Sequence, residues 1–158
     1  MRRFALLLTL LALPLAFGAT AAAVPPDSAS GTISGGSLDF SDFHVRGGNE
    51  FVHITAAGAT ITGTVTGTVV TELDEVVHPT GNSTLQGSMV CDPCTVDGRS
   101  GTVVFRQVGT IVGDPFALEM QTTAVRATGG LAGLEAQFVV RWNGVDPAAY
   151  TGSYHFGP

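Results

Sequence analysis

The most reactive side chains of the sequence are two cysteines in the run Cys91-Asp92-Pro93-Cys94, and the chain contains no others. Two thiols at this spacing can form a local disulfide, bind a metal as thiolates, or act as a redox pair. Thioredoxin-like redox chemistry needs a thiolate at a helix N-terminus, whereas the residues around this pair favour strands. We therefore predict a structural disulfide that fixes a bulge at Pro93. Free or metal-linked thiols and redox catalysis are the alternatives.

Two histidines, His44 and His53, flank a Gly-Gly-Asn turn at 47–49. If residues 48 and 49 form a two-residue turn, hairpin pairing places the two imidazoles opposite each other, with Cβ atoms about 5 Å apart. Asp42, opposite Thr55 on the same face, would then be a third metal ligand. The favoured alternative is a polar row of a hairpin. We predict no metal site, with His44 and His53 as weak candidates.

An acidic stretch contains Glu72, Asp74 and Glu75. Paired carboxylates can perform acid–base catalysis, but adjacent residues of a strand point to opposite faces, so a solvated edge is the favoured interpretation. The chain has no G-x-S-x-G, H-E-x-x-H or phosphate-loop motif. We therefore name no catalytic residue and expect no cofactor.

Apolar side chains that share one face of a strand are the remaining candidates for a binding site. In Leu134–Trp142 nearly every second residue is apolar and most of the residues between them are polar. This alternation predicts one buried and one solvent-facing side. Such side chains either fill the core, which we favour, or line a lumen. The candidates for a pocket wall are Phe105, Phe116, Leu118, Met120, Phe138, Trp142, Tyr150 and Tyr154.

The elements that must position these residues are strands. From Gly31 onward the chain is rich in Thr, Val and Gly, with closely spaced turn signals, which is typical of a sandwich or barrel. Asp97-Gly98 is the clearest hairpin turn, and glycines in the Thr-Gly steps near residues 63 and 67 predict bent strands. We expect about eight strands in an antiparallel sheet. The segments with a strand pattern are Leu38–Arg46, Glu50–Ala57, Thr60–Val77, Ser83–Cys91, Cys94–Val96, Arg99–Gly109, Phe116–Ala127, Leu134–Trp142 and Tyr150–Phe156.

The N-terminal residues 1–23 have the three zones of a signal peptide. Met1-Arg2-Arg3 is positive, Phe4–Phe17 is apolar and uncharged, and Ala21-Ala22-Ala23 offers small residues to a signal peptidase. We predict cleavage after Ala23, with an uncleaved N-terminal anchor as the alternative. The Pro- and Ser-containing segment 24–30 is predicted to be a flexible linker, and residues 31–158 one barrel domain.

The charge of the chain excludes some partners. The formal net charge is −6, and all seven basic residues are arginine. Removal of the signal peptide takes two of them and leaves five against 13 acidic residues, a net charge near −8. An acidic domain is a poor ligand for nucleic acid or for anionic lipid. We expect a secreted protein, extracellular or periplasmic, with no membrane span after cleavage; no oligomeric state is predicted.

Three segments resemble secreted bacterial proteins related to the allene oxide cyclase–like, dirigent-related barrels. They are the hairpin Cys94–Phe105, the glycine-rich Thr128–Leu134 and the ending Tyr150–Phe156. The resemblance extends over residues 31–156 in order and spacing. It implies a small antiparallel barrel of about eight strands with a pocket along its axis, in which the characterised relatives cyclise or steer reactive intermediates. No position here matches a catalytic motif of those cyclases.

Three functions follow as hypotheses. The favoured one is a secreted barrel that binds a small apolar molecule in its lumen without chemistry. The second is a cyclase or isomerase that acts on a reactive intermediate and works mainly by holding its substrate in a reactive shape. The third is an outer-membrane barrel, which the Thr- and Gly-rich strands and the lack of aromatic girdles disfavour.

Overall fold

The structure is a computed structural model that describes residues 25–145 and 147–157. The predicted signal peptide and Val24 lie outside the described residues. The described chain contains nine strands in one antiparallel sheet. Their bounds are β1 (Asp27–Ser34), β2 (Ser37–Arg46), β3 (Asn49–Gly63), β4 (Val65–Val77), β5 (Ser83–Val96), β6 (Arg99–Val112), β7 (Ala117–Gly129), β8 (Leu134–Trp142) and β9 (Ala148–Phe156).

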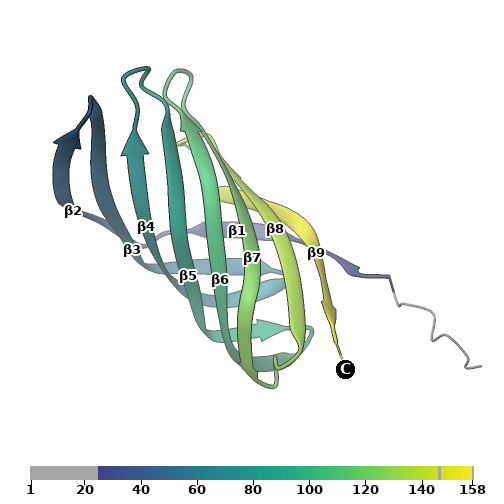
Figure 1. Cartoon of the computed structure of the whole chain (residues 1–158). Coiled ribbons are helices and arrows are strands. Elements are labelled where there is room, and N and C mark those ends of the chain that lie inside the picture. Colours follow the sequence, from purple (N-terminus) through teal and green to yellow (C-terminus); the bar gives the residue numbers. More distant parts are fainter. Residues whose placement is uncertain (1–24, 146, 158) are drawn as a thin grey trace, which may run out of the picture.

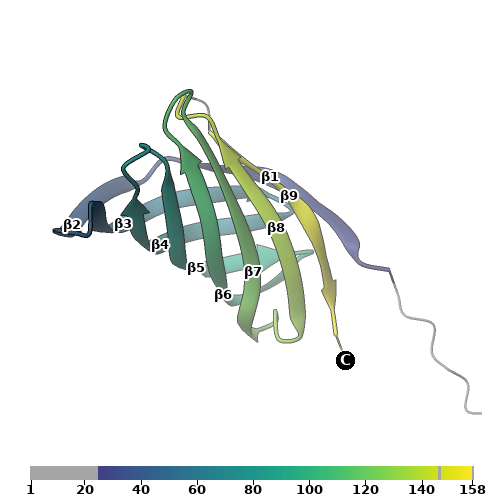
Figure 2. The same cartoon turned by 45° about the horizontal axis from the view of Figure 1, so that its top comes forward.

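The sheet closes into a ring because β1 pairs with both β9 and β3. β1 and β2 lie end to end along β3, since Ser34 pairs with Thr60 and Ser37 pairs with Ala57. Together they occupy one position in the ring, so the ring has eight strand positions. In Figures 1 and 2, β1 crosses behind the curved sheet from β9 towards the side of β2 and β3. The predicted single antiparallel barrel of about eight strands is confirmed.

The two ends of the barrel differ. At the closed end lie the turns β3–β4, β5–β6 and β7–β8, together with the start of β1. At the open end lie the tips of β2–β3, β4–β5 and β6–β7, two of which stand together at the top of Figure 1. β2 is the last strand of the sheet order, so its outer edge pairs with no other strand of the described sheet. The ring is therefore incomplete at the open end.

Two glycines and a bulge shape β2. Gly35 and Gly36, at φ of 74° and 86°, separate β1 from β2. Such positive φ values favour glycine, which has no Cβ to clash. A register shift between Ser41 and His44 marks a β-bulge, where Asp42 has a φ of 54°. Bulges and charged residues are common devices that prevent a free edge from pairing with other chains.

The closed end is filled by aromatic side chains. Phe138 packs against Phe105 and Tyr150, with ring centroids 5.7 Å and 5.1 Å apart. The Tyr150 hydroxyl accepts a 2.9 Å hydrogen bond from the backbone N–H of Val65, which joins β9 to β4 across the interior. Leu131, in the β7–β8 turn, is fully buried at this end. The aromatic part of the core therefore lies in the closed half, and buried aliphatic residues of the same cluster extend towards the open end.

The predicted linker is corrected in part. Residues 27–30 belong to β1, where Ala29 is buried and Asp27 pairs with Tyr154. Their composition suggested a linker, but the ring can close only if a strand lies between β3 and β9. The backbone pairing with these two neighbours outweighs the weak local preference of the segment.

The predicted strand Thr60–Val77 is also corrected, because the chain reverses at Gly63. Gly63 has a φ of 108°, and a Cβ there would overlap the backbone of Ser30. The neighbouring Thr64 N–H donates to the Ser30 carbonyl oxygen at 2.9 Å. Gly58, taken as a boundary between strands, instead lies in a bulge within β3.

The cysteine pair lies within β5. Cys91 and Cys94 form a disulfide, with Cα atoms 5.2 Å apart and both side chains fully buried. The β5–β6 register shifts between these two residues, so the predicted bulge is present. Gly67 on β4 leaves room for it, since a Cβ there would overlap the Pro93 carbonyl oxygen and the Cys91 Sγ atom. The Asp97-Gly98 hairpin turn is confirmed by φ values of 52° and 72°.

Candidate functional site: the cavity at the open end

The inner face of the open half lines a cavity of about 480 Å³. Residues of the β1–β2 junction, the inner faces of β3 to β8 and the β8–β9 connection surround it. This volume lies within the range of small-molecule sites. Its described lining residues are Ile33, Ser34, Gly35, Gly36, Leu38, Ala56, Ala59, Val69, Thr71, Leu73, Met89, Gln107, Leu118, Met120, Val140, Trp142, Val145, Pro147 and Ala148.

The lining is mostly apolar. Besides the indole N–H of Trp142, only Ser34, Thr71 and Gln107 contribute polar side-chain groups among its described residues, and none of the described lining residues carries a titratable group. General acid–base catalysis needs such a group within reach of the reacting atoms. Apolar binding needs only a dry, well-shaped surface. The chemistry of the lining therefore suits binding better than proton transfer.

Gln107 is the most buried polar residue of the lining, with 2% of its surface exposed. Its Nε2 group donates a 3.3 Å hydrogen bond to Thr122 Oγ1 and contacts the Met89 sulfur at 3.9 Å. Its Oε1 atom is buried and accepts no hydrogen bond from the described residues. A buried acceptor without a partner is costly, so this amide is the chemically distinctive point of the cavity.

The sequence-predicted pocket residues divide between the two halves. Leu118, Met120 and Trp142 line the cavity. Phe105, Phe138 and Tyr150 are buried in the packed closed half instead. Burial raises the pKa of the Tyr150 hydroxyl, which keeps it neutral as a hydrogen-bonding group.

The other two predicted residues lie outside the described lining of the cavity. Phe116 is in the β6–β7 turn, where its ring meets the edge of Trp142 with centroids 5.4 Å apart. Tyr154 is near the end of β9 and contacts Phe156, with centroids 6.3 Å apart. The alternation that grouped these two aromatics with the pocket identifies a face of a strand, but not the depth of a residue along the barrel.

Gln107 and the β1–β2 junction are parts of the site that sequence reasoning missed. Gln107 follows Val103 and Phe105 at two-residue spacing, so all three point to the inner face of β6. A polar residue in an inward-facing row was the available signal. The junction, residues 33–36, had no comparable signal, because its role depends on the closure of the ring.

The predicted opposition of His44 and His53 is wrong. The hairpin turns at Gly47-Gly48 instead of at residues 48 and 49, so His44 pairs with Phe51 and stacks on its ring at 4.9 Å, and the bulge at Asp42 then places His53 opposite Ser41. His53 Nδ1 lies 2.9 Å from Asp74 Oδ1. The hydrogen bond to Asp74 raises the pKa of His53 above its usual 6.5. The described residues contain no cluster of three or more histidine, cysteine or acidic side chains that could hold a metal.

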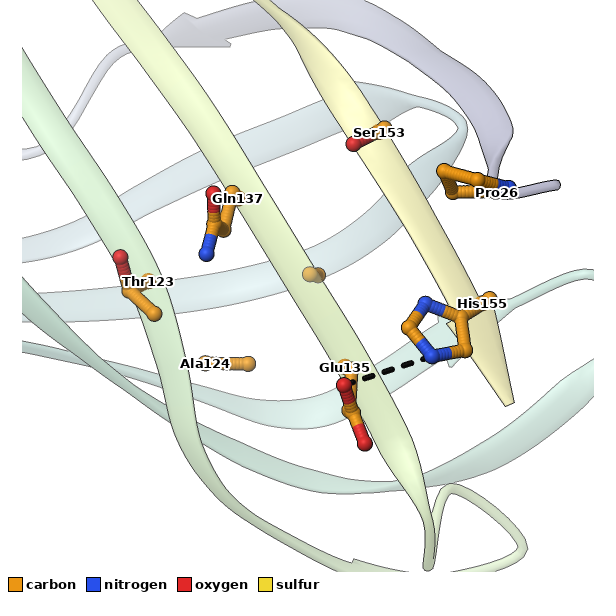
Figure 3. Close-up of a pocket in the computed structure, with 8 residues that line it drawn as sticks. Pro26, Thr123, Ala124, Glu135, Gln137, Ser153 and His155 are labelled. Atoms are coloured by element: carbon orange, nitrogen blue, oxygen red, sulfur yellow. Dashed lines mark ion pairs between the residues drawn. The ribbon is translucent and has the colours of Figure 1, made fainter. Parts of the chain in front are cut away.

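A second, polar groove lies outside the barrel at β7, β8 and β9, beneath Pro26 (Figure 3). Its volume is about 420 Å³. His155 and Glu135 form an ion pair at 3.3 Å, and Ser153 lies on the same face of β9, opposite Gln137. The ion pair is largely exposed, with 42% and 70% of the two side chains accessible. Water screens such a pair, so this groove is a weaker candidate than the cavity.

The described part of the chain contains no helix with the length and apolar character needed to cross a membrane. Comparisons with known proteins add a likeness of fold. Neither a family model nor a curated protein sequence matches the chain. It is similar to a solved structure, a protein of unknown function from the DUF3224 family of Shewanella oneidensis MR-1, with a TM-score of 0.68 and 17% sequence identity. The alignment covers 85% of this chain and 100% of that one. At this identity the likeness shows a shared fold and nothing further.

Proposed function

We propose that this protein binds a small, predominantly apolar molecule in the cavity at the open end of its barrel, without chemical conversion. The observation that carries the proposal is the contrast within one lumen. The closed half is filled by Phe105, Phe138 and Tyr150, whereas the open half keeps about 480 Å³ of space behind an apolar wall. Protein interiors are normally close-packed, so a void of this size next to a well-packed core suits an occupant.

The position of the cavity also supports binding. Its wall includes Leu38 of β2 and Val145 of the β8–β9 connection, and both side chains are exposed to solvent. A ligand can therefore enter from solvent without unfolding of the packed half. The polar groups of the described lining are few and uncharged, which favours binding over the cyclase or isomerase alternative.

Trp142 provides a direct test, because it is the only tryptophan of the chain and lines the cavity. The probe is limonene, a small terpene hydrocarbon that is transparent where tryptophan is excited. We expect a saturable change in Trp142 emission as limonene is added. The Ala56→Phe variant fills part of the cavity and is expected to weaken binding at least about tenfold.

Ala57→Phe is the matched control. Ala57 follows Ala56 in β3 and points to the opposite face, and it is not part of the described lining. Limonene should bind this variant as it binds the unmodified protein. Circular dichroism and thermal unfolding verify that both variants are folded. Non-saturable binding, or equal weakening by both substitutions, would overturn the proposal.

We propose further that the chain works outside the cytoplasm and is related to the allene oxide cyclase–like barrels. The apolar stretch after Met1-Arg2-Arg3 supports export, and the Cys91–Cys94 disulfide is compatible with an oxidising compartment. The ring of eight strand positions with a cavity on its axis supports the relationship. Fractionation of the native host and N-terminal sequencing test the export proposal, and a product that begins at Val24 is the expected result.

A further inference from the structure

The cavity contains one polar group whose bonding is incomplete. Gln107 is 98% buried, and its Oε1 atom accepts no hydrogen bond from the described protein atoms. The other half of the amide is engaged, since Nε2 donates to Thr122 Oγ1 at 3.3 Å and contacts the Met89 sulfur at 3.9 Å. These contacts hold the amide in place and leave Oε1 without a partner in a residue that lines the cavity; because Oε1 is itself buried, a ligand in the cavity reaches it only when a neighbouring side chain moves aside.

We infer that the ligand of this cavity carries a single hydrogen-bond donor, a hydroxyl or an N–H group, within an otherwise apolar body, and that it donates to Gln107 Oε1. The inference rests on the proposed function, because it concerns the same cavity. A buried carbonyl needs a donor from water or from a ligand. A hydrocarbon that displaces water leaves the acceptor unpaired, whereas an alcohol or an amine replaces the lost bond.

The direction of the hydrogen bond follows from the neighbours of the amide. If the oxygen and nitrogen of Gln107 exchanged places, Thr122 would have to donate to Oε1, and the NH₂ group, which has two hydrogens to place, would be directed away from both of its present contacts. The observed arrangement leaves one lone acceptor, and the exchanged arrangement would leave two donors. The observed arrangement is therefore the less costly one, and it selects a donor on the ligand.

Three tricyclic molecules of nearly identical shape test this directly: fluorene, carbazole and dibenzofuran. They differ in one bridging group, which is CH₂ in fluorene, the donor N–H in carbazole and an acceptor oxygen in dibenzofuran. Equilibrium dialysis measures the dissociation constant of each. We expect carbazole to bind about tenfold more tightly than fluorene, because it completes a buried hydrogen bond. Dibenzofuran should bind no more tightly than fluorene.

The Gln107→Met variant removes the amide and keeps a side chain of similar length. It should bind fluorene at least as well as the unmodified protein does, and the ratio of carbazole to fluorene affinity should fall about tenfold. Comparison of this ratio between the unmodified protein and the variant cancels the difference in hydration between the two probes, because the free probes are the same in both measurements. Gln121→Met is the matched control, because Gln121 is exposed on the outer face of β7, and it should leave the ratio unchanged.

Each outcome separates the two proposals. A carbazole-to-fluorene ratio that is the same in the unmodified protein and in Gln107→Met would overturn the polar anchor and leave the apolar site intact. A preference for dibenzofuran would overturn the assigned donor, since the amide would then present its N–H groups. If none of the three probes binds the unmodified protein, and limonene also fails, the proposed function is overturned together with the inference. If Gln107→Met does not fold, the ratio in the unmodified protein and the shift of the Gln107 side-chain amide signals in NMR decide the question.

Discussion

The two halves of the barrel are built from the same strands but use their inner faces differently. In the closed half, β6 and β8 contribute Phe105 and Phe138 to a dry aromatic core. In the open half the same two strands contribute Gln107 and Trp142 to a cavity wall. The change takes two residues along β6 and four residues along β8.

The difference shows how a packed core and an open cavity are separated in a small barrel. An eight-strand lumen is just wide enough to be filled by side chains or to hold one ligand; in this chain side chains fill one end and a cavity remains at the other. The closed half is packed without a ligand, because the buried side chains of Tyr150 and Leu131 occupy its interior. The open half can therefore leave space, and even a buried acceptor without a partner, at a cost that the packed half offsets.

The claim that the closed half supplies most of the stability is tested most strongly by the same substitution, phenylalanine to alanine, at each end of the barrel. Phe105→Ala removes a fully buried ring from the closed half and should lower the free energy of unfolding by about 3–5 kcal/mol. Phe116→Ala removes a ring that is 37% exposed at the open end, and its cost should be about 1 kcal/mol. Urea denaturation measures both. Similar losses would show that the open end contributes as much to stability as the core does.

A smaller effect is expected when the Tyr150 hydroxyl is removed, because its hydrogen bond joins β9 to β4 across the closed half. Tyr150→Phe leaves the buried N–H of Val65 without its 2.9 Å acceptor, which should cost about 1–3 kcal/mol. Tyr154→Phe is the control, because Tyr154 is only partly buried, and its change should stay within about 0.5 kcal/mol. Equal effects of the two substitutions would indicate that the Tyr150–Val65 bond does not hold the closed half together.

Much of the closed half could be predicted from the sequence, because it depends on local signals. The alternation in Leu134–Trp142 gave the bounds of β8 and its buried face, and Asp97-Gly98 gave a hairpin turn. What local signals could not show is closure. β1 has a linker-like composition and forms a strand only because β3 and β9 both pair with it.

The cavity was harder to predict for a different reason. Met120 and Phe138 follow the same alternation and are both largely buried, yet one lines a void and the other fills a core. The distinction depends on the volume enclosed by all eight strand positions, which no single strand encodes. The histidine pairing failed because the hairpin turns at Gly47-Gly48, one residue earlier than predicted, which gives each residue of β2 a new partner on β3.

The smallest expected effect concerns how the open end is held on its outer surface, where apolar packing is sparse. His53 of β3 binds Asp74 of β4 at 2.9 Å, and this hydrogen bond raises the pKa of His53 above 6.5. A histidine whose pKa is higher in the folded state than in the unfolded state adds stability that is complete below the unfolded pKa. That stability is lost as the pH rises through the folded pKa.

A change from about pH 8 to about pH 6 should therefore raise the melting temperature of the unmodified protein more than that of Asp74→Asn. NMR titration of the His53 ring should give a pKa above 6.5 that falls in Asp74→Asn, and a pKa at or below 6.5 in the unmodified protein would show that this pair does not support the open end.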